Sequence, residues 1–262
     1  MTYFGFLLRF VLIPILILGA VSAWDWRRSS DLPGFQKGQF WRIVLLHVVL
    51  ALVYTTPWDN YLVATGVWSY APHLVSGVVF GWVPLEEYTF FVLETILSGL
   101  WWSLVVRRIS PPADFSPNKK RVLISAAVLV ALWLLFAGLF FSGWKPANYL
   151  SLTLFWALPA IFPQILFGAD ILWHFRKALL LVILPPTVYL SLADIVALRA
   201  GTWTISSAHT SGVLFFGILP LEEIVFFLVT NALIAFGLTL MLSDLSQKRI
   251  AAWRLKSFKG SA

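Results

Sequence analysis

Two acidic motifs of the same sequence stand in the two halves of this chain. Each has a proline, a leucine and two glutamates, then two intervening residues, and then two phenylalanines. The motifs are Pro84-Leu85-Glu86-Glu87 with Phe90-Phe91, and Pro220-Leu221-Glu222-Glu223 with Phe226-Phe227. Proline fits the first turn of a helix, where its missing N–H has no partner to lose. Each motif therefore predicts a helix start with two carboxyl groups in the first turn, where the helix dipole favours negative charge.

Carboxyl groups at these places can carry acid–base chemistry. An ionisable side chain inside the apolar slab of a membrane is costly and is a candidate for function. Low dielectric and a neighbouring carboxylate favour the protonated form, so a buried pair can hold a proton and deliver it as a general acid. The phenylalanines lie one helical turn beyond the glutamates, and aromatic faces stabilise cations. The competing interpretation is an interfacial charge pair beside phenylalanines that only pack.

The elements that must position the motifs are membrane-spanning helices. Of the 262 residues, 60% are hydrophobic and 12% are charged, whereas a typical soluble domain has about 25% charged residues. The apolar residues form blocks of roughly 17–24, the length that crosses a hydrocarbon core. The blocks predict an all-α integral membrane protein with about seven spans, at about 3–23, 41–57, 84–106, 122–142, 149–168, 178–198 and 214–241.

The basic residues predict the orientation. Sixteen of the 19 lysines and arginines fall in connections and a tail that seven spans place on one side. The positive-inside rule then puts the N-terminus outside and the C-terminus in the cytoplasm of a multi-pass cell-membrane protein. The net charge of +7 therefore reflects basic residues on the cytoplasmic side, next to membrane lipid, and no nucleic-acid partner is expected. We expect the first span to be retained, although Val21-Ser22-Ala23 resembles a signal-peptidase site. No cysteine is present, which excludes disulfides and thiol nucleophiles.

The motifs belong to a longer internal repeat. The matched pairs are Tyr54 and Tyr189, Asp59 and Asp194, Gly66 and Gly201, Trp68 and Trp203, and, after one extra residue, His73 and His209. Spans 1–3 and 5–7 are therefore predicted to be two parallel three-helix repeats, related by an axis along the membrane normal, with span 4 as connector helix. The predicted units are residues 1–110, a connector at 111–145, a second unit at 146–243 and a basic tail at 244–262.

The repeat predicts where the acids meet. Asp59 and Asp194 are expected to close spans 2 and 6 at the depth of the glutamates, so that six carboxyl groups gather between the halves. Glu94 is left outside this predicted site because its matched residue is Thr230. Residues 74–83 are apolar but too short to span; they either extend span 3 above a kink or form a re-entrant piece.

The doubled motif, the upstream aspartate and the Gly-x-Trp sequence between them resemble the membrane lycopene cyclase family. This family comprises heterodimeric bacterial cyclases, fused archaeal and bacterial forms, and the cyclase half of fungal fused carotenoid enzymes. Its hallmark is Pro-x-Glu-(Glu or Asp), which occurs twice in fused chains. The resemblance covers residues from about 40 to 106 and from about 178 to 241, so this chain is similar to the fused form.

The resemblance implies a reaction and a set of site residues. Such enzymes cyclise the linear ψ-ends of lycopene to β-rings, giving γ-carotene and then β-carotene. Glu86, Glu87, Glu222 and Glu223 are the implied proton donors and acceptors, with Asp59 and Asp194 holding or relaying the proton. The implied substrate-binding residues are aromatic: Phe90, Phe91, Phe226, Phe227, Trp68, Trp203, Tyr54 and Tyr189. The implied substrate is lycopene within the bilayer, and association with other carotenoid enzymes is compatible with this.

No cofactor and no metal are expected. The implied reaction is redox-neutral, and the chain has no Gly-x-Gly-x-x-Gly dinucleotide fingerprint. Within the family, ε-ring or C50-carotenoid cyclases remain alternatives. The motif of glutamate-dependent intramembrane proteases has an arginine four residues after the second glutamate. Phe91 and Phe227 occupy those positions here, which argues against this class. A proton-coupled membrane transporter is the alternative of another class. The glutamate pairs lie near span ends and not at mid-depth, where transporters bind their coupling ions, which argues against this alternative.

Overall fold

The protein is described by a computed structural model that covers residues 1–28, 32–109, 112 and 114–259. Within these residues, seven helices are long and apolar enough to cross a membrane, which confirms the predicted number. The membrane-length helices are α1–α2 (Tyr3–Leu7 and Ile13–Arg28, joined by a π-helical turn at Leu8–Leu12), α3 (Phe40–Ala64), α4 (Leu85–Arg108), α5 (Lys119–Phe141), α6 (Asn148–His174), α7 (Arg176–Arg199) and α8 (Leu221–Leu242). Residues 110 and 111, at the first predicted unit boundary, and 260–262 of the predicted tail lie outside the described residues.

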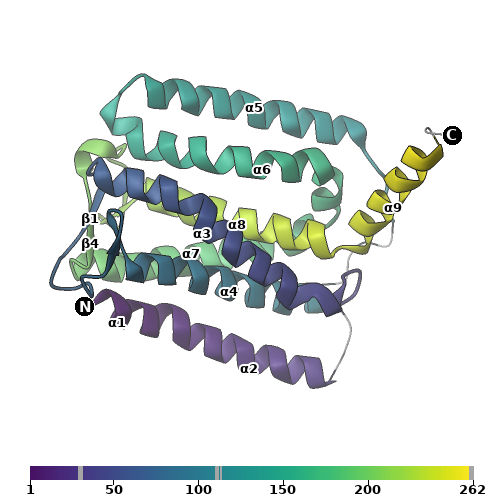
Figure 1. The fold of residues 1–262 in the computed structure, drawn as a ribbon, viewed down its shortest axis with the longest axis horizontal. Helices are drawn as coiled ribbons and strands as arrows, with labels where there is room; N and C mark the ends of the chain where they lie inside the picture. Colours follow the sequence, from purple (N-terminus) through teal and green to yellow (C-terminus); the bar gives the residue numbers. More distant parts are fainter. Residues whose placement is uncertain (29–31, 110–111, 113, 260–262) are drawn as a thin grey trace.

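The helices lie side by side along the longest axis of the molecule (Figure 1). The α1–α2 helix forms one edge, and α5 forms the opposite edge, where it packs on α6. The N-terminus and the end of the C-terminal helix α9 (Asp244–Lys259) lie at opposite ends of the molecule. The helices α4 and α8, which begin with the acidic motifs, are the most buried of the seven. The motifs thus stand at the starts of the two most buried helices, at one end of the bundle.

Polar contacts fix α4 against α8 inside the bundle. Ser98 Oγ donates a hydrogen bond to Asn231 Oδ1 at 2.7 Å, and Trp102 Nε1 donates to Thr239 Oγ1 at 2.9 Å. Hydrogen bonds of this kind join helices in a membrane, where the hydrophobic effect does not drive one helix onto another. The two motif-bearing helices therefore have a defined relative position.

Short hairpins precede both motifs, and they correct three predictions. Strands β2 (Val79–Phe80) and β3 (Val83–Pro84) pair before α4, while β5 (Leu214–Phe215) and β6 (Leu219–Pro220) pair before α8. Residues 74–83 are therefore not a helical extension of span 3, and the alternative of a re-entrant piece stays a prediction. Span 7 begins at 221 rather than 214, and each proline caps its helix in an extended conformation instead of lying in the first turn. The tight turns need glycine, because Gly81 and Gly217 adopt φ of 67° and 69°.

A second pair of strands connects the two halves. Strands β1 (Trp68–Tyr70) and β4 (Trp203–Ile205) pair antiparallel, with Ser69 opposite Thr204. Matched positions of the repeat thus face each other in this ribbon, at the end of the molecule where the N-terminus lies (Figure 1). The parallel arrangement of the two units and their boundaries stay predictions.

The aspartates lie inside their helices rather than at the ends. Helix α3 continues to Ala64 and α7 to Arg199, so Asp59 and Asp194 are each about one turn from a helix end. The α3 helix passes Pro57 without ending, because interior prolines are tolerated in spanning helices whose neighbours satisfy the freed carbonyls. The prediction that these residues close spans 2 and 6 was therefore wrong by about a turn.

Candidate functional site

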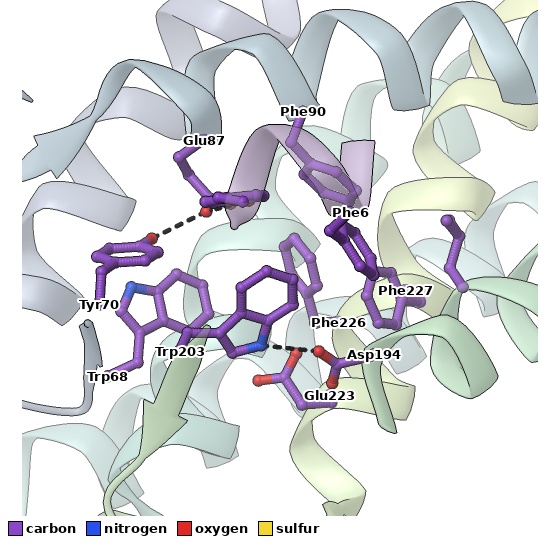
Figure 2. Close-up of a pocket in the computed structure, with 12 residues that line it drawn as sticks. Phe6, Trp68, Tyr70, Glu87, Phe90, Asp194, Trp203, Glu223, Phe226 and Phe227 are labelled. Atoms are coloured by element: carbon purple, nitrogen blue, oxygen red, sulfur yellow. Dashed lines mark hydrogen bonds between the residues drawn. The ribbon is translucent and has the colours of Figure 1, made fainter. Parts of the chain in front are cut away.

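A small chamber lies between the two halves, close to the helix starts (Figure 2). Its volume is about 30 Å³, the room of roughly two water molecules. Three acids and a wall of mostly aromatic side chains surround it. The lining residues are Tyr3, Phe6, Trp68, Tyr70, Glu87, Phe90, Leu190, Asp194, Trp203, Glu223, Phe226 and Phe227. The second glutamate of each motif therefore reaches the same space.

Tyrosine hydroxyl groups hold these two glutamates. Glu87 Oε2 accepts hydrogen bonds from Tyr3 at 2.6 Å and from Tyr70 at 2.9 Å. Glu223 Oε1 accepts one from Tyr149 at 2.7 Å. Tyr70 belongs to β1, outside the spanning helices; burial and the nearby Glu87 carboxyl raise the pKa of its phenol well above the usual value of about 10. The phenol thus stays protonated and remains a hydrogen-bond donor.

The first glutamate of each motif has a different surrounding. Glu86 Oε1 accepts from the backbone N–H of Ser76 at 2.5 Å, and its Oε2 accepts from the Ser76 hydroxyl at 3.1 Å. Glu222 Oε1 accepts from the backbone N–H of Ser211 at 2.6 Å. Both carboxyl groups are fully buried. They attach the segments before the hairpins to the helix starts and do not line the chamber.

The two matched aspartates differ in their partners. Asp194 lines the chamber, and its Oδ1 accepts a hydrogen bond from Trp203 Nε1 at 2.8 Å (Figure 2). Asp59 is fully buried within electrostatic range of Glu87. The Trp68 indole interacts with the Asp59 carboxyl group, as the matched Trp203 does with Asp194, but in a geometry too poor for a regular hydrogen bond. A buried acid that is held this weakly costs stability, which makes Asp59 a candidate for proton transfer.

The predicted aromatic residues divide into three groups. Phe90, Phe226, Phe227, Trp68 and Trp203 line the chamber. Phe91 and Tyr54 line a second, larger cavity. Tyr189 lies outside both cavities and donates from its hydroxyl to the Phe10 carbonyl at 2.9 Å. The structure therefore brings five of the eight predicted aromatic residues to the acids.

The second cavity has a volume of about 730 Å³ and lies among α3, α4, α6 and α8. Glu94 lines it, is 4% exposed, and accepts a hydrogen bond from Thr230 Oγ1 at 3.0 Å. The sequence prediction left Glu94 out because Thr230 is its matched residue, yet these two matched residues contact each other. Tyr3 and Tyr149 were missed as well. A comparison of the starts of spans 1 and 5, with its own offset, would have paired them.

The arrangement suits proton transfer to an apolar substrate. Three buried carboxyl groups, with tyrosine and indole donors on their oxygens, can give and take protons within one chamber. The aromatic walls offer π faces to a developing cation. The seven apolar helices, four of which line this chamber together with the β1–β4 ribbon, define a polytopic membrane protein with a buried acid–base site.

Comparison with known proteins identifies the family. Over 91% of its length the chain is 36% identical to lycopene beta-cyclase from Halobacterium salinarum, of which 95% is covered. It is 36% identical over 79% of its length to the bifunctional lycopene cyclase/phytoene synthase of Podospora anserina, and 35% identical over 74% to that of Sporisorium reilianum. The chain belongs to the lycopene cyclase family, as the motif predicted.

The match to the fungal proteins is partial. The chain spans 36% of the Podospora protein and 29% of the Sporisorium protein. No protein-family model matches the chain, and no solved structure matches it.

Proposed function

We propose that this protein cyclises the linear ψ-ends of lycopene to β-rings, giving γ-carotene and then β-carotene. The observation that carries the proposal is the convergence of Glu87, Asp194 and Glu223 on one chamber with aromatic walls. The names of the relatives, lycopene beta-cyclase above all, support the choice of substrate and ring. The reaction is an isomerisation, because each ring closure leaves the composition and oxidation state of the substrate unchanged.

The chemistry needs one acid and one base. A protonated carboxyl group donates its proton to C2 of the terminal C1=C2 alkene, which leaves a tertiary cation at C1. The π electrons of C5=C6 form the C1–C6 bond, and the positive charge moves to C5. A carboxylate then removes the proton from C6, and the electrons of that C–H bond form the C5=C6 alkene of the β-ring. One proton enters and one leaves, so the enzyme is restored without a redox cofactor.

The contacts support different roles for the predicted acids. We assign proton donation and removal to Glu87, Glu223 and Asp194, which line the chamber. Asp59, buried beside Glu87, is assigned to relaying the proton. Glu86 and Glu222 are assigned to holding the segments before the hairpins through Ser76 and Ser211.

The proposed setting is a cell membrane, with lycopene entering from the bilayer. The seven apolar helices support a multi-pass protein. The basic connections favour an outer N-terminus and a cytoplasmic C-terminus. The chamber, which lies at the N-terminal end of the bundle, would then be near the outer face.

Expression in cells that accumulate lycopene tests the proposed function. Pigments are extracted and separated by chromatography, and carotenoids with β-rings are the expected products. Unchanged lycopene beside well-folded, membrane-inserted protein would contradict the proposal. ε-ring products would instead show a different site of proton removal in the same kind of chamber.

Loss of the Tyr149 hydroxyl should slow this reaction. Tyr149→Phe removes the donor to Glu223, and one hydrogen bond of roughly 1.4 kcal/mol corresponds to about a tenfold change in rate. We expect about tenfold less ring formation per amount of inserted protein, measured by chromatography at early times. Tyr61→Phe is the matched control, because Tyr61 is 45% exposed on α3 and lines neither cavity. Equal product from both variants would argue against a role of the hydroxyl.

A further inference from the structure

Both halves of the chain build the chamber. Glu87 and Phe90 come from α4, whereas Asp194 comes from α7 and Glu223 from α8. The acids of the two motifs therefore serve one space, not two. A substrate with two identical ends can present only one of them to this space at a time.

The chamber and the large cavity have one side chain in common. Phe226 lines both of them, and in Figure 2 its ring lies between Phe227 and the indoles of Trp68 and Trp203. The ring stacks on Trp58 with centroids 5.4 Å apart and an interplanar angle of 8°. Because the chamber has only about 30 Å³, a terminal isoprenoid group needs this ring to move before it can reach the acids.

The large cavity is long and mainly apolar. On α8 its lining runs from Phe226 to Met241, which is about 22 Å along the axis at 1.5 Å per residue. Its walls include Leu50, Ala160 and Leu233, and its far end is bounded by Gln39 and by Gln247 and Ile250 of α9. A long and mainly apolar space of this kind fits a polyene chain better than a compact ligand.

The walls on either side of this cavity are joined at the end near the chamber. The Tyr54 hydroxyl donates to the Trp156 carbonyl at 2.8 Å, and Trp156 Nε1 donates to the Tyr54 carbonyl at 3.2 Å. These reciprocal bonds tie α3 to α6. At the far end, Arg249 of α9 binds Asp170 of α6 at 2.7 Å, which fixes α9 beside the cavity. The cavity is thus a preformed space with a defined near end and far end.

We propose that the large cavity binds the polyene chain of the carotenoid, that Phe226 is the gate to the shared chamber, and that both ends of one substrate are cyclised there in succession. This inference rests on the proposed function. After the first closure the one-ring product must turn around, so that the unreacted end passes Phe226. The finished ring then occupies the far end, near Met241 and Gly237.

Variants that fill the cavity test this inference. Leu233→Trp fills the middle from α8, and Ala160→Leu narrows it from α6 with a smaller change. Leu228→Trp is the matched control, because Leu228 is 37% exposed on the same helix and lines neither cavity. We expect Leu233→Trp to lower ring formation at least tenfold and Ala160→Leu to lower it severalfold. Leu228→Trp should behave as the unmodified chain.

A narrowed far end of the large cavity should permit the first ring closure and hinder the second. Met241→Trp leaves the near end free but crowds the place of the finished ring. We expect the one-ring carotenoid to become the main product of Met241→Trp, while the control forms mainly the two-ring product. A product ratio like that of the control would overturn succession in one chamber.

Pigment retention tests the cavity independently of catalysis. Each variant is combined with Glu223→Gln, purified in detergent as a single species, and its lycopene per protein is measured by absorbance. We expect Leu233→Trp and Ala160→Leu to retain severalfold less lycopene than Leu228→Trp. Equal retention in all three would overturn the inference. If the unmodified chain forms no rings, the proposed function fails, and this retention comparison still decides whether the cavity binds the polyene.

Discussion

Replacement of Glu223 by glutamine is expected to lower ring formation by about 100- to 10,000-fold, the usual effect of losing a general acid or base. Glu223 lines the chamber, and glutamine cannot donate or accept the transferred proton. The same replacement at the neighbouring Glu222 should cost less than about tenfold. The amide oxygen of glutamine can still accept the hydrogen bond from the Ser211 N–H, which Glu222 accepts at 2.6 Å.

The comparison is made by chromatography of pigments from lycopene-accumulating cells, normalised to inserted protein. Glu86→Gln and Glu87→Gln repeat it in the first motif, where Glu86 binds Ser76 and Glu87 lines the chamber. A large loss from the first glutamate of either motif, with a small loss from the second, would reverse the assignment made from the contacts.

Asp59→Asn should abolish most activity and at the same time stabilise the protein. Asp59 is fully buried, and its carboxyl group has only the poorly aligned Trp68 indole beside it as a donor. A neutral amide of the same shape avoids burying a charge, which we expect to be worth about 1 kcal/mol, or roughly 2–4 °C in melting temperature. Without a relaying carboxyl beside Glu87, ring formation should fall about 100-fold.

Thermal unfolding in detergent and pigment chromatography on the same preparations measure both effects. Asp194→Asn is the informative comparison, because Asp194 has the Trp203 indole as a donor at 2.8 Å. We expect Asp194→Asn to lose activity without a gain in stability. An Asp59→Asn protein that keeps full activity would exclude the relay, and one that melts lower would show that Asp59 supports the fold.

Much of the fold could be predicted from hydropathy and charge. A spanning helix must satisfy its own backbone, so long apolar blocks mark the helices directly. The hairpins before α4 and α8 were missed because their strands have only two residues and are as apolar as the helices that follow. Hydropathy could not separate residues 214–220 from span 7, whereas the glycines at positive φ, Gly81 and Gly217, were the available turn signal.

The site was predicted at the level of the motif but not of the single side chain. Consecutive residues on a helix point about 100° apart, so Glu86 and Glu87 have different surroundings, and only Glu87 lines the chamber. Which of them does depends on the packing of α4 against the rest of the bundle, and the repeat gives no information about it. Glu94 was left out of the predicted site because its matched residue in the repeat, Thr230, is not an acid. The structure shows that these two matched residues contact each other.

The small volume of the chamber has a consequence for how the reaction terminates. A tertiary carbocation in contact with water is captured as an alcohol. Here the acids and aromatic rings leave only about 30 Å³, and an end group that enters this space displaces whatever water it holds. Loss of the C6 proton to a carboxylate is then the available exit, so the close packing of Phe90, Phe226 and Phe227 directs the outcome toward a ring alkene and away from hydration.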